Sequence, residues 1–137
     1  MIGVLSTDEI DQLLKRQSVG RLACTANDRP YVVPITYAYD GSSVYAYSGP
    51  GRKIEMMREQ PLVCFEVDEV DGPSEWRSVV AEGTYEELTS ERSRREALAL
   101  LGITNGAVAR ALNQANRGVV FRIRLGDRSG RFEQRDA

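Results

Sequence analysis

The chain has 137 residues, 42% of them apolar and 28% charged, and these values are typical of one folded domain spanning residues 1–137. The 18 basic and 20 acidic residues nearly cancel, which excludes an overall field that would attract nucleic acid or an anionic membrane, so any anion site must be local. The sequence contains no histidine, which excludes the usual general base, the usual zinc and haem ligand, and Ser-His or Cys-His nucleophiles.

A capped helix and a strand are predicted near the start of the chain. Ser6–Glu9 has the spacing of a capping box, with the glutamate three places after the serine. Apolar residues at helical spacing follow at Ile10, Leu13 and Leu14, so a short amphipathic helix opens the fold. Val19–Thr25 then has the composition of a strand.

A second strand is predicted over Pro30–Tyr39, after a turn at Asn27–Asp28. One face of this strand is large and aromatic, with Tyr31, Val33, Ile35, Tyr37 and Tyr39. The other face is smaller and partly polar, with Val32, Pro34, Thr36 and Ala38. Because the second face is small, a ligand has room to lie against it.

A hairpin and a short helix come next. Asp40–Gly41 is a strong hairpin signal, and Ser43–Ser48 is predicted to return as the third strand. Arg52–Gln60 has the pattern of a helix that ends before Pro61. The side chains expected to turn inward from this helix are Ile54 and Met57.

The second half of the chain predicts further strands around a helical insert. Leu62–Val70 and Trp76–Leu88 are strands separated by the turn Asp71–Ser74. Helical spacing then runs through the segment 90–116, with a break near Gly102. Val119–Leu125 is predicted as the last strand, and the charged tail from Gly126 is expected to be frayed. Six short strands with few helices predict a mainly β barrel or sandwich.

The most informative motif is Ser48–Lys53, where a strand ends in a glycine turn and a helix begins with two cations. Positive charges at a helix N-terminus oppose the macrodipole, so Arg52 and Lys53 are unfavourable for the helix alone. A phosphate would relieve this conflict, because first-turn amides, the Ser48 hydroxyl and both cations can all donate to it. The alternative is a solvated turn with two exposed charges.

Other polar and aromatic residues have common structural roles. Trp76 is the single tryptophan and is either a core residue or an aromatic wall beside a ring system. The carboxylates of Glu66, Asp68 and Glu69 are expected to be solvated charges at a loop edge, with no paired acid and base.

Targeting signals and metal-binding cysteine motifs are not evident. No apolar run approaches the roughly 18 residues that indicate a membrane span, and the first ten residues lack the layout of a secretory signal, so we expect a cytoplasmic protein. Cys24 and Cys64 lie in apolar stretches and are expected to be buried, reduced thiols rather than metal ligands.

Three stretches resemble the pyridoxamine 5′-phosphate oxidase-like, FMN-binding split-barrel family, especially its small members grouped with nitroimidazole-resistance proteins. The first is LSTDEIDQLLKRQSVGRLACTANDRPYVVPITYAYDG. The second, GRKIEMMREQP, is similar to that family's Arg-Lys pair and the short helix after it, with the same spacing from lysine to proline. The third, WRSVVAEGTYEEL, is similar to a strand with an Arg-Ser-Val triplet and a glycine four residues after the valine, here Gly83.

The resemblance implies a six-stranded split β-barrel with short flanking helices, an FMN cofactor and a pocket completed by the partner subunit. It implies that Arg52 and Lys53 hold the FMN phosphate with Ser48 nearby. The residues implied to lie beside the isoalloxazine ring are Val33, Pro34, Ile35 and Thr36. Further flavin contacts are implied at Trp76, Arg77 and Ser78, although Ser78 stands where the true oxidases usually have glutamine.

Two differences from the family's sequence pattern reduce the range of activities expected for this chain. True pyridoxamine phosphate oxidases hold their substrate with a C-terminal Arg-x-His element, which this chain lacks, so that oxidation is not expected. Many nitroimidazole-resistance relatives have a histidine just before the glycine turn, where this chain has Tyr47. Haem degradation is disfavoured for the same reason, because histidine is the common axial ligand.

Two functions remain open. The first is a flavin-dependent oxidoreductase that passes a hydride between FMN and a small substrate or nicotinamide donor, without a side chain acting as base. The second is a binding module that holds FMN or a deazaflavin without turnover. Because the apolar strand faces exceed what so few helices can cover, we also expect an isologous homodimer with two cofactor sites at its interface.

Overall fold

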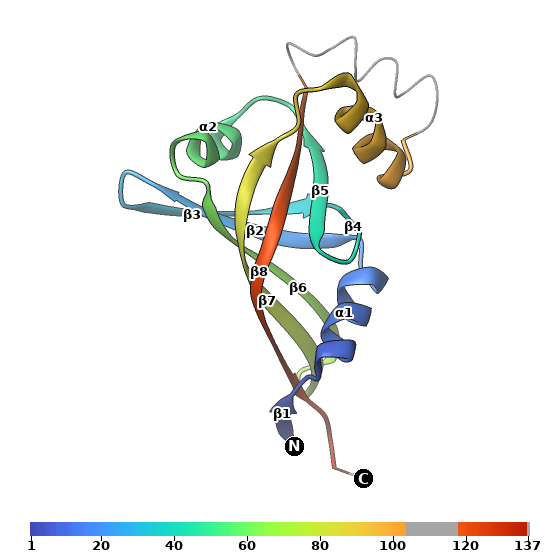
Figure 1. Ribbon diagram of the computed structural model, residues 1–137. Helices are drawn as coiled ribbons and strands as arrows, with labels where there is room; N and C mark the ends of the chain where they lie inside the picture. The colour runs from blue at the N-terminus through green and yellow to red at the C-terminus, as the bar shows by residue number, and fades with distance from the viewer. Residues whose placement is uncertain (104–117, 137) are drawn as a thin grey trace.

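The computed structural model describes residues 1–103 and 118–136, and in this part eight strands form one antiparallel sheet flanked by short helices (Figure 1). The strands are β1 (Ile2–Val4), β2 (Val19–Ala26), β3 (Arg29–Thr36), β4 (Ala38–Tyr39), β5 (Ser43–Ser48), β6 (Leu62–Gly72), β7 (Glu75–Glu87) and β8 (Val119–Glu133). The helices are α1 (Thr7–Arg16), α2 (Arg52–Glu59) and α3 (Glu91–Leu100). Each predicted element that falls on described residues is present. Two strands are additional. One is β1, and the other is β4, because the predicted strand Pro30–Tyr39 is interrupted at Tyr37.

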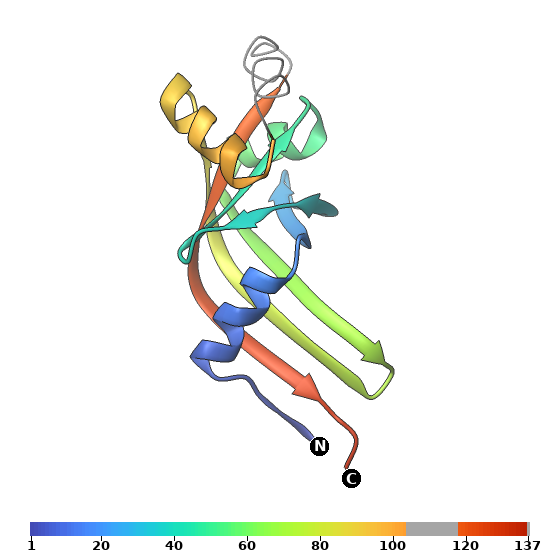
Figure 2. The ribbon, with the colours of Figure 1, turned by 90° about the vertical axis from the view of Figure 1, so that its right-hand side faces the viewer.

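The sheet is a barrel that does not close. Its strand order is β3-β2-β6-β7-β8-β5-β4, and β1 pairs with the outer part of β8. The two ends of this row, β3 and β4, follow one another in the chain and share no ladder among the described strands. Figures 1 and 2 show the sheet curling around α1, with α2 and α3 at the opposite end from the two termini. The expected mainly β split barrel is confirmed.

Local signals account for the first elements. The Ser6 hydroxyl accepts from the Glu9 amide at 3.2 Å, and the Glu9 carboxylate accepts from the Ser6 amide at 2.9 Å, which completes the predicted capping box. Asn27 and Asp28 have φ values of 53° and 60°, in the left-handed region where these two residue types are tolerated. Two such residues give a two-residue turn whose twist matches the strands it joins, and this turn joins β2 to β3.

The main core fills the inside of the barrel. Helix α1 contributes Leu13 and Leu14, and α2 contributes Ile54 and Met57, each with no exposed surface. The strands contribute inward-facing residues that are buried to a similar degree: Leu22, Phe65, Val67, Val79, Phe121 and Ile123. The Tyr37 hydroxyl donates to the Leu14 carbonyl at 2.7 Å, so the residue between β3 and β4 ties α1 to the sheet.

A second, smaller core lies under α3. Ala97 and Leu98 of the helix pack on Leu88 and Val120, with Tyr45 and Tyr47 alongside. Helix α3 therefore covers the outer side of β5 and β8. The remainder of the predicted helical insert, residues 104–116, lies outside the described residues.

The prediction that the chain frays after Leu125 is wrong. Strand β8 continues to Glu133 and pairs with both β7 and β1. The register with β7 shifts where Gly126 and Asp127 face one residue, so the inward positions change from odd to even numbers. Gly130 is then buried beneath Leu5 and Ile10. The alternation of inward apolar and outward polar residues is interrupted at this bulge, so the sequence pattern predicted the end of the strand there.

The prediction that Glu66, Asp68 and Glu69 are solvated loop-edge charges is also wrong, because all three are half-buried within β6. On the outer face, Arg21 of β2 donates through Nε to Glu66 at 2.8 Å and through a second nitrogen to Asp68. Burial raises the pKa of the Glu66 carboxyl to about 7, and the hydrogen bond with Asp68 adds to the rise while Arg21 opposes it. An acidic pair bridged by an arginine therefore lies on the sheet's outer face.

Glu69 faces the opposite way and fastens α1 to the barrel. It accepts from Arg16 at 2.9 Å and from Gln17 at 3.1 Å, both at the end of α1. Arg77 of β7 donates to the same carboxylate at 3.2 Å. These contacts lower the pKa of Glu69, with the Arg16 hydrogen bond as the largest cause.

The expectation of buried, reduced cysteines holds for one of the two residues. Neither cysteine is in a disulfide; Cys24 is buried, whereas Cys64 is only half-buried on the outer face of β6. Among the described residues, no helix is long and apolar enough to cross a bilayer.

Replacing Gly83 should destabilise the fold. A Cβ at this position would overlap the Cγ2 atom of Ile123 in the core. We expect Gly83→Ala to lower the free energy of unfolding by about 1–3 kcal/mol, measured by urea denaturation. Gly72→Ala is the control, because a Cβ there meets no atom within 4 Å. Equal effects of the two substitutions would contradict this packing.

Replacing Glu66 should change how stability depends on pH. Because the folded-state pKa of Glu66 is raised from 4.5 to about 7, its contribution to stability is complete below pH 4.5 and is lost as the pH rises through 7. Glu66→Gln stays neutral and should therefore lose less stability than the wild type between pH 5 and pH 8. We expect a difference on the order of 1 kcal/mol, since solvent screens this partly exposed group.

Urea denaturation at both pH values measures this difference. Glu82→Gln, which removes an exposed carboxylate from the same face, is the control. Parallel pH profiles for the wild type and Glu66→Gln would refute the assignment.

Candidate functional site

The predicted motif Ser48–Lys53 forms a strand, a turn and a helix, as expected. Strand β5 ends at Ser48, and α2 begins at Arg52. The residue before α2, Gly51, offers no side chain to cap the helix, so the first-turn amides have no side-chain acceptor. The half-buried Ser48 hydroxyl donates to the Gly49 carbonyl at 2.8 Å and lies beside this turn.

The two cations of the motif are free to bind an anion. The Arg52 guanidinium lies over the Tyr31 ring, with 4.5 Å between its central carbon and the ring centroid, and Lys53 is half-buried. Neither forms an ion pair with a carboxylate of residues 1–103 or 118–136. By contrast, Arg58 on the same helix pairs with Glu87 at 2.9 Å. Stacking on an aromatic ring holds a guanidinium in place while its N–H donors stay available.

The field of both cations reaches the inner side of β2. The Cys24 thiol is buried there, and its register partner on β3 is Tyr31. Burial raises the pKa of Cys24, while Arg52 and Lys53 act against this rise. Both charges therefore act on the β2–β3 end of the barrel, while the Arg52 side chain itself is exposed and Lys53 is half-buried.

Strand β3 is an edge strand that runs away from these cations. Val33 lies two residues after Tyr31 and is half-buried on the same face, and Ile35 on that face is buried. Pro34 and Thr36 are exposed on the opposite face. Because β3 pairs only with β2 among the described strands, its outer edge remains open. Arg52 therefore lies beside Tyr31 near the start of β3, and Val33–Thr36 follow further along the same edge strand. Ser48 and Lys53 are near Arg52 in the chain, at the end of β5 and in the first turn of α2.

Trp76 and Ser78 lie elsewhere in the same chain. They pair with Val70 and Asp68 of β6. The part of β6 nearest to Arg52 is at Cys64, because Cys64 pairs with β2 beside Cys24, the partner of Tyr31. The separation along β6 is roughly 13–20 Å. Trp76 is half-buried rather than in the core, and its indole nitrogen donates to Glu133 at 3.1 Å.

Arg77 lies between these two residues but faces the inside of the barrel. Successive side chains of a strand point to opposite faces, and Arg77 shares the inner face with Val79 and its partner Glu69. Its observed contact is the ion pair that fastens α1. Its role as a flavin contact stays a prediction.

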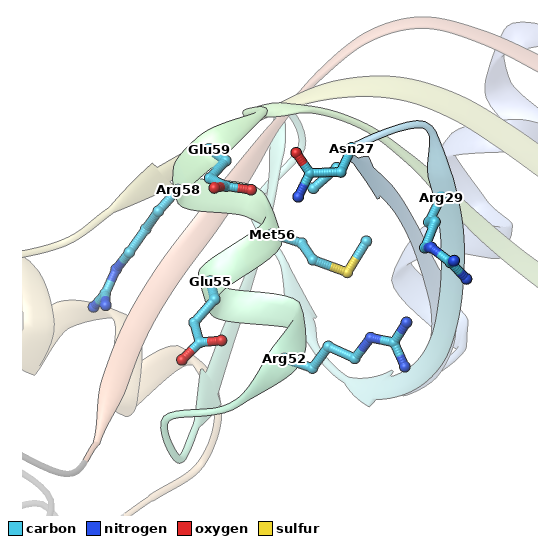
Figure 3. Close-up of a pocket in the computed structure, with 8 residues that line it drawn as sticks. Asn27, Arg29, Arg52, Glu55, Met56, Arg58 and Glu59 are labelled. Atoms are coloured by element: carbon cyan, nitrogen blue, oxygen red, sulfur yellow. The ribbon is translucent and has the colours of Figure 1, made fainter.

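A cleft of about 610 Å³ lies between α2 and the β2–β3 turn (Figure 3). The side chains of Arg52 and Met56 reach into it from α2, and Asn27 and Arg29 lie across from them. The remaining lining residues are Ala26, Glu55, Arg58 and Glu59. Sequence reasoning missed Asn27 and Arg29, because only the folding of the hairpin against α2 brings them to Arg52. It also missed Met56, which lies one turn after Arg52 on α2.

The donors at the start of α2 suit a phosphate carried by a planar ring. The first-turn amides, Arg52 and Lys53 supply donors and positive charge. The open edge of β3 beside them offers apolar side chains and unpaired backbone groups to a flat molecule. The residues present therefore fit a nucleotide-like cofactor.

Comparisons with known proteins agree with this fold. An FAD-binding protein from Mesorhizobium loti is 38% identical, with a TM-score of 0.82 over 98% of this chain and 99% of that one. An FAD binding protein from Mycobacterium smegmatis is 23% identical with a TM-score of 0.74 over 97% and 100% of the two chains, a likeness of fold alone. An uncharacterized protein of Rhizobium meliloti is 41% identical over 87 residues, or 64% of this chain, and the match spans 58% of that relative's length.

The comparison with protein families covers almost the whole chain. The sequence model of the pyridoxamine 5′-phosphate oxidase family matches residues 6–132, from the cap of α1 to Phe132 near the end of β8. With the split barrel and its 38% identical structural relative, this match shows that the chain belongs to the pyridoxamine 5′-phosphate oxidase family.

Proposed function

We propose that this protein is a flavin-dependent oxidoreductase that holds FMN by its phosphate at the start of α2. The observation that carries the proposal is the pair Arg52 and Lys53, which lie together at a helix N-terminus without a carboxylate partner among the described residues. The 38% identical relative that is an FAD-binding protein supports a flavin, because FMN and FAD share the ring and the first phosphate.

In this proposal each part of the site has a separate task. Arg52 and Lys53 neutralise the phosphate, and the Tyr31 ring keeps the Arg52 guanidinium oriented. Val33–Thr36 lie beside the flavin ring along the edge strand. When bound, the flavin supplies the redox chemistry, so the protein's work is to bind and orient it and to admit a small substrate or nicotinamide donor.

We further propose that two copies of the chain complete the site. Val19, Val32 and Val80 are exposed on the outer face of the sheet, around Arg21 and its two carboxylates. Trp76 and Ser78 lie on this same face, at the end away from α2. A two-fold arrangement that covers the apolar patch would bring these two residues of one copy toward the cations of the other.

Removing the two cations should weaken flavin binding. We expect Arg52→Ala/Lys53→Ala to lose at least about 100-fold in FMN affinity, because each charge-assisted contact contributes roughly 1.5–3 kcal/mol. Absorbance or fluorescence titration measures the affinity, and steady-state oxidation of NADH or NADPH measures turnover.

The matched control is Arg58→Ala, which removes a cation from the same helix that is already paired with Glu87. Unchanged FMN affinity in the double variant would refute the phosphate clamp. Tight FMN binding by the wild type with negligible turnover would instead favour the non-catalytic module, whether for FMN or for a deazaflavin.

A charge placed on the outer face should prevent dimer formation. We expect the wild type to have the mass of two chains by light scattering, and Val80→Glu to have the mass of one, because a buried unpaired charge is costly. Leu100→Glu is the control, since it adds a charge at an exposed apolar residue of α3. A monomeric wild type at high protein concentration would contradict the shared site.

A further inference from the structure

We propose that the cleft between α2 and the β2–β3 turn binds the adenosine monophosphate half of FAD, so that this chain prefers the dinucleotide over FMN. The inference rests on the proposed function, because it starts from a flavin phosphate held at Arg52 and Lys53. It adds a second subsite formed by Asn27, Arg29 and Met56.

The order of side chains along β3 sets the direction in which a longer cofactor would extend. The proposed ring contacts are Val33–Thr36, and Arg52 stacks on Tyr31 just before them. Arg29 is two residues further back, roughly 7 Å along the strand and at the mouth of the cleft. A molecule with its ring at Val33–Thr36 and its first phosphate at Arg52 would therefore place a second phosphate near Arg29.

The charges of the cleft favour this second phosphate at one end only. Arg29 and Arg52 face the cleft from opposite walls (Figure 3), and Arg29 also makes no ion pair with any carboxylate of the described residues. Two guanidiniums across a gap suit a diphosphate, which can accept from both. Glu55 and Arg58 also line the cleft, but Figure 3 shows their side chains directed away from Arg29, and Arg58 pairs with Glu87.

The rest of the cleft suits a nucleoside rather than a bare polyphosphate. Met56 lies at its centre and offers an apolar, polarisable surface to the face of a purine. Asn27 and Glu59 lie at the far end, where an amide and a carboxylate can bind ribose hydroxyls or an exocyclic amine. The Glu59 carboxylate would repel further phosphates.

The size of the cleft agrees with such an occupant. Its volume of about 610 Å³ is within the range of roughly 300–1,000 Å³ found for small-molecule pockets. In the proposed site the flavin ring lies outside the cleft along β3, and the first phosphate lies at the Arg52 end of the cleft, so the remaining space is available to the second phosphate and the adenosine.

The test compares the affinities of FMN and FAD for the purified wild-type protein and for Arg29→Ala, by flavin fluorescence titration. We expect the wild type to bind FAD at least about tenfold more tightly than FMN, and Arg29→Ala to lose this preference while keeping its FMN affinity. AMP should compete with FAD but leave FMN bound. Arg92→Ala, which removes an exposed arginine of α3 away from the cleft, is the matched control.

Other outcomes would overturn the inference, and they differ from a failure of the proposed function. Equal affinities for FMN and FAD in the wild type, or an equal loss of both in Arg29→Ala, would leave the flavin clamp intact and refute the second subsite. The same holds if NADPH binding to the FMN-loaded protein, rather than FAD affinity, depends on Arg29. If neither flavin binds, the proposed function itself fails, and the subsite fails with it.

Discussion

The backbone ladder between β7 and β8 is the constraint on which the rest of the structure depends. It runs from Trp76 opposite Glu133 to Glu87 opposite Phe121, and the bulge at Gly126–Asp127 divides it. On one side of the bulge β8 sends Phe121 into the barrel core, and on the other it places Gly130 beneath α1. Because one strand serves both ends of the barrel, the helix-covered end and the terminal end are held in a fixed relation.

The distribution of ion pairs separates structural charges from candidate binding charges. Most described arginines contact a carboxylate, and these include Arg16, Arg21, Arg58, Arg77, Arg122 and Arg124. Several of these pairs join elements that are distant in the chain, such as α1 with β6 and α2 with β7. Arg52 and Lys53 lack such partners among residues 1–103 and 118–136, and a helix N-terminus is an unfavourable place for them. In the proposed site this placement serves the binding of a phosphate and not the stability of the helix.

The sequence predicted those features that depend on local interactions. The capping box at Ser6–Glu9, the turn at Asn27–Asp28 and the helix after Gly51 follow from neighbouring residues, and all three are present. The extension of β8 could not be predicted in the same way, because a bulge changes which residues face inward and pairing with β1 and β7 supplies the hydrogen bonds.

Features that depend on contacts between distant segments were missed or misjudged. Glu66 and Asp68 belong to a run of acidic residues, a pattern typical of solvent-exposed segments. Arg21 from another strand nevertheless donates to both. The cleft depends on the β2–β3 turn meeting α2, so Arg29 and Met56 carried no signal of their own. The inward direction of Arg77 was predictable in principle, because Trp76 and Ser78 on either side of it must face outward.

The separation of Trp76 and Ser78 from Arg52 has a thermodynamic consequence for the proposed two-fold assembly. A lone chain would offer a flavin only part of its binding surface, so association of the chains and retention of the cofactor would be linked by mass action. Each would strengthen the other by the same free energy. Dilution would then release flavin as it separates the subunits, and the amount of protein in the cell would help to determine how much of it is loaded.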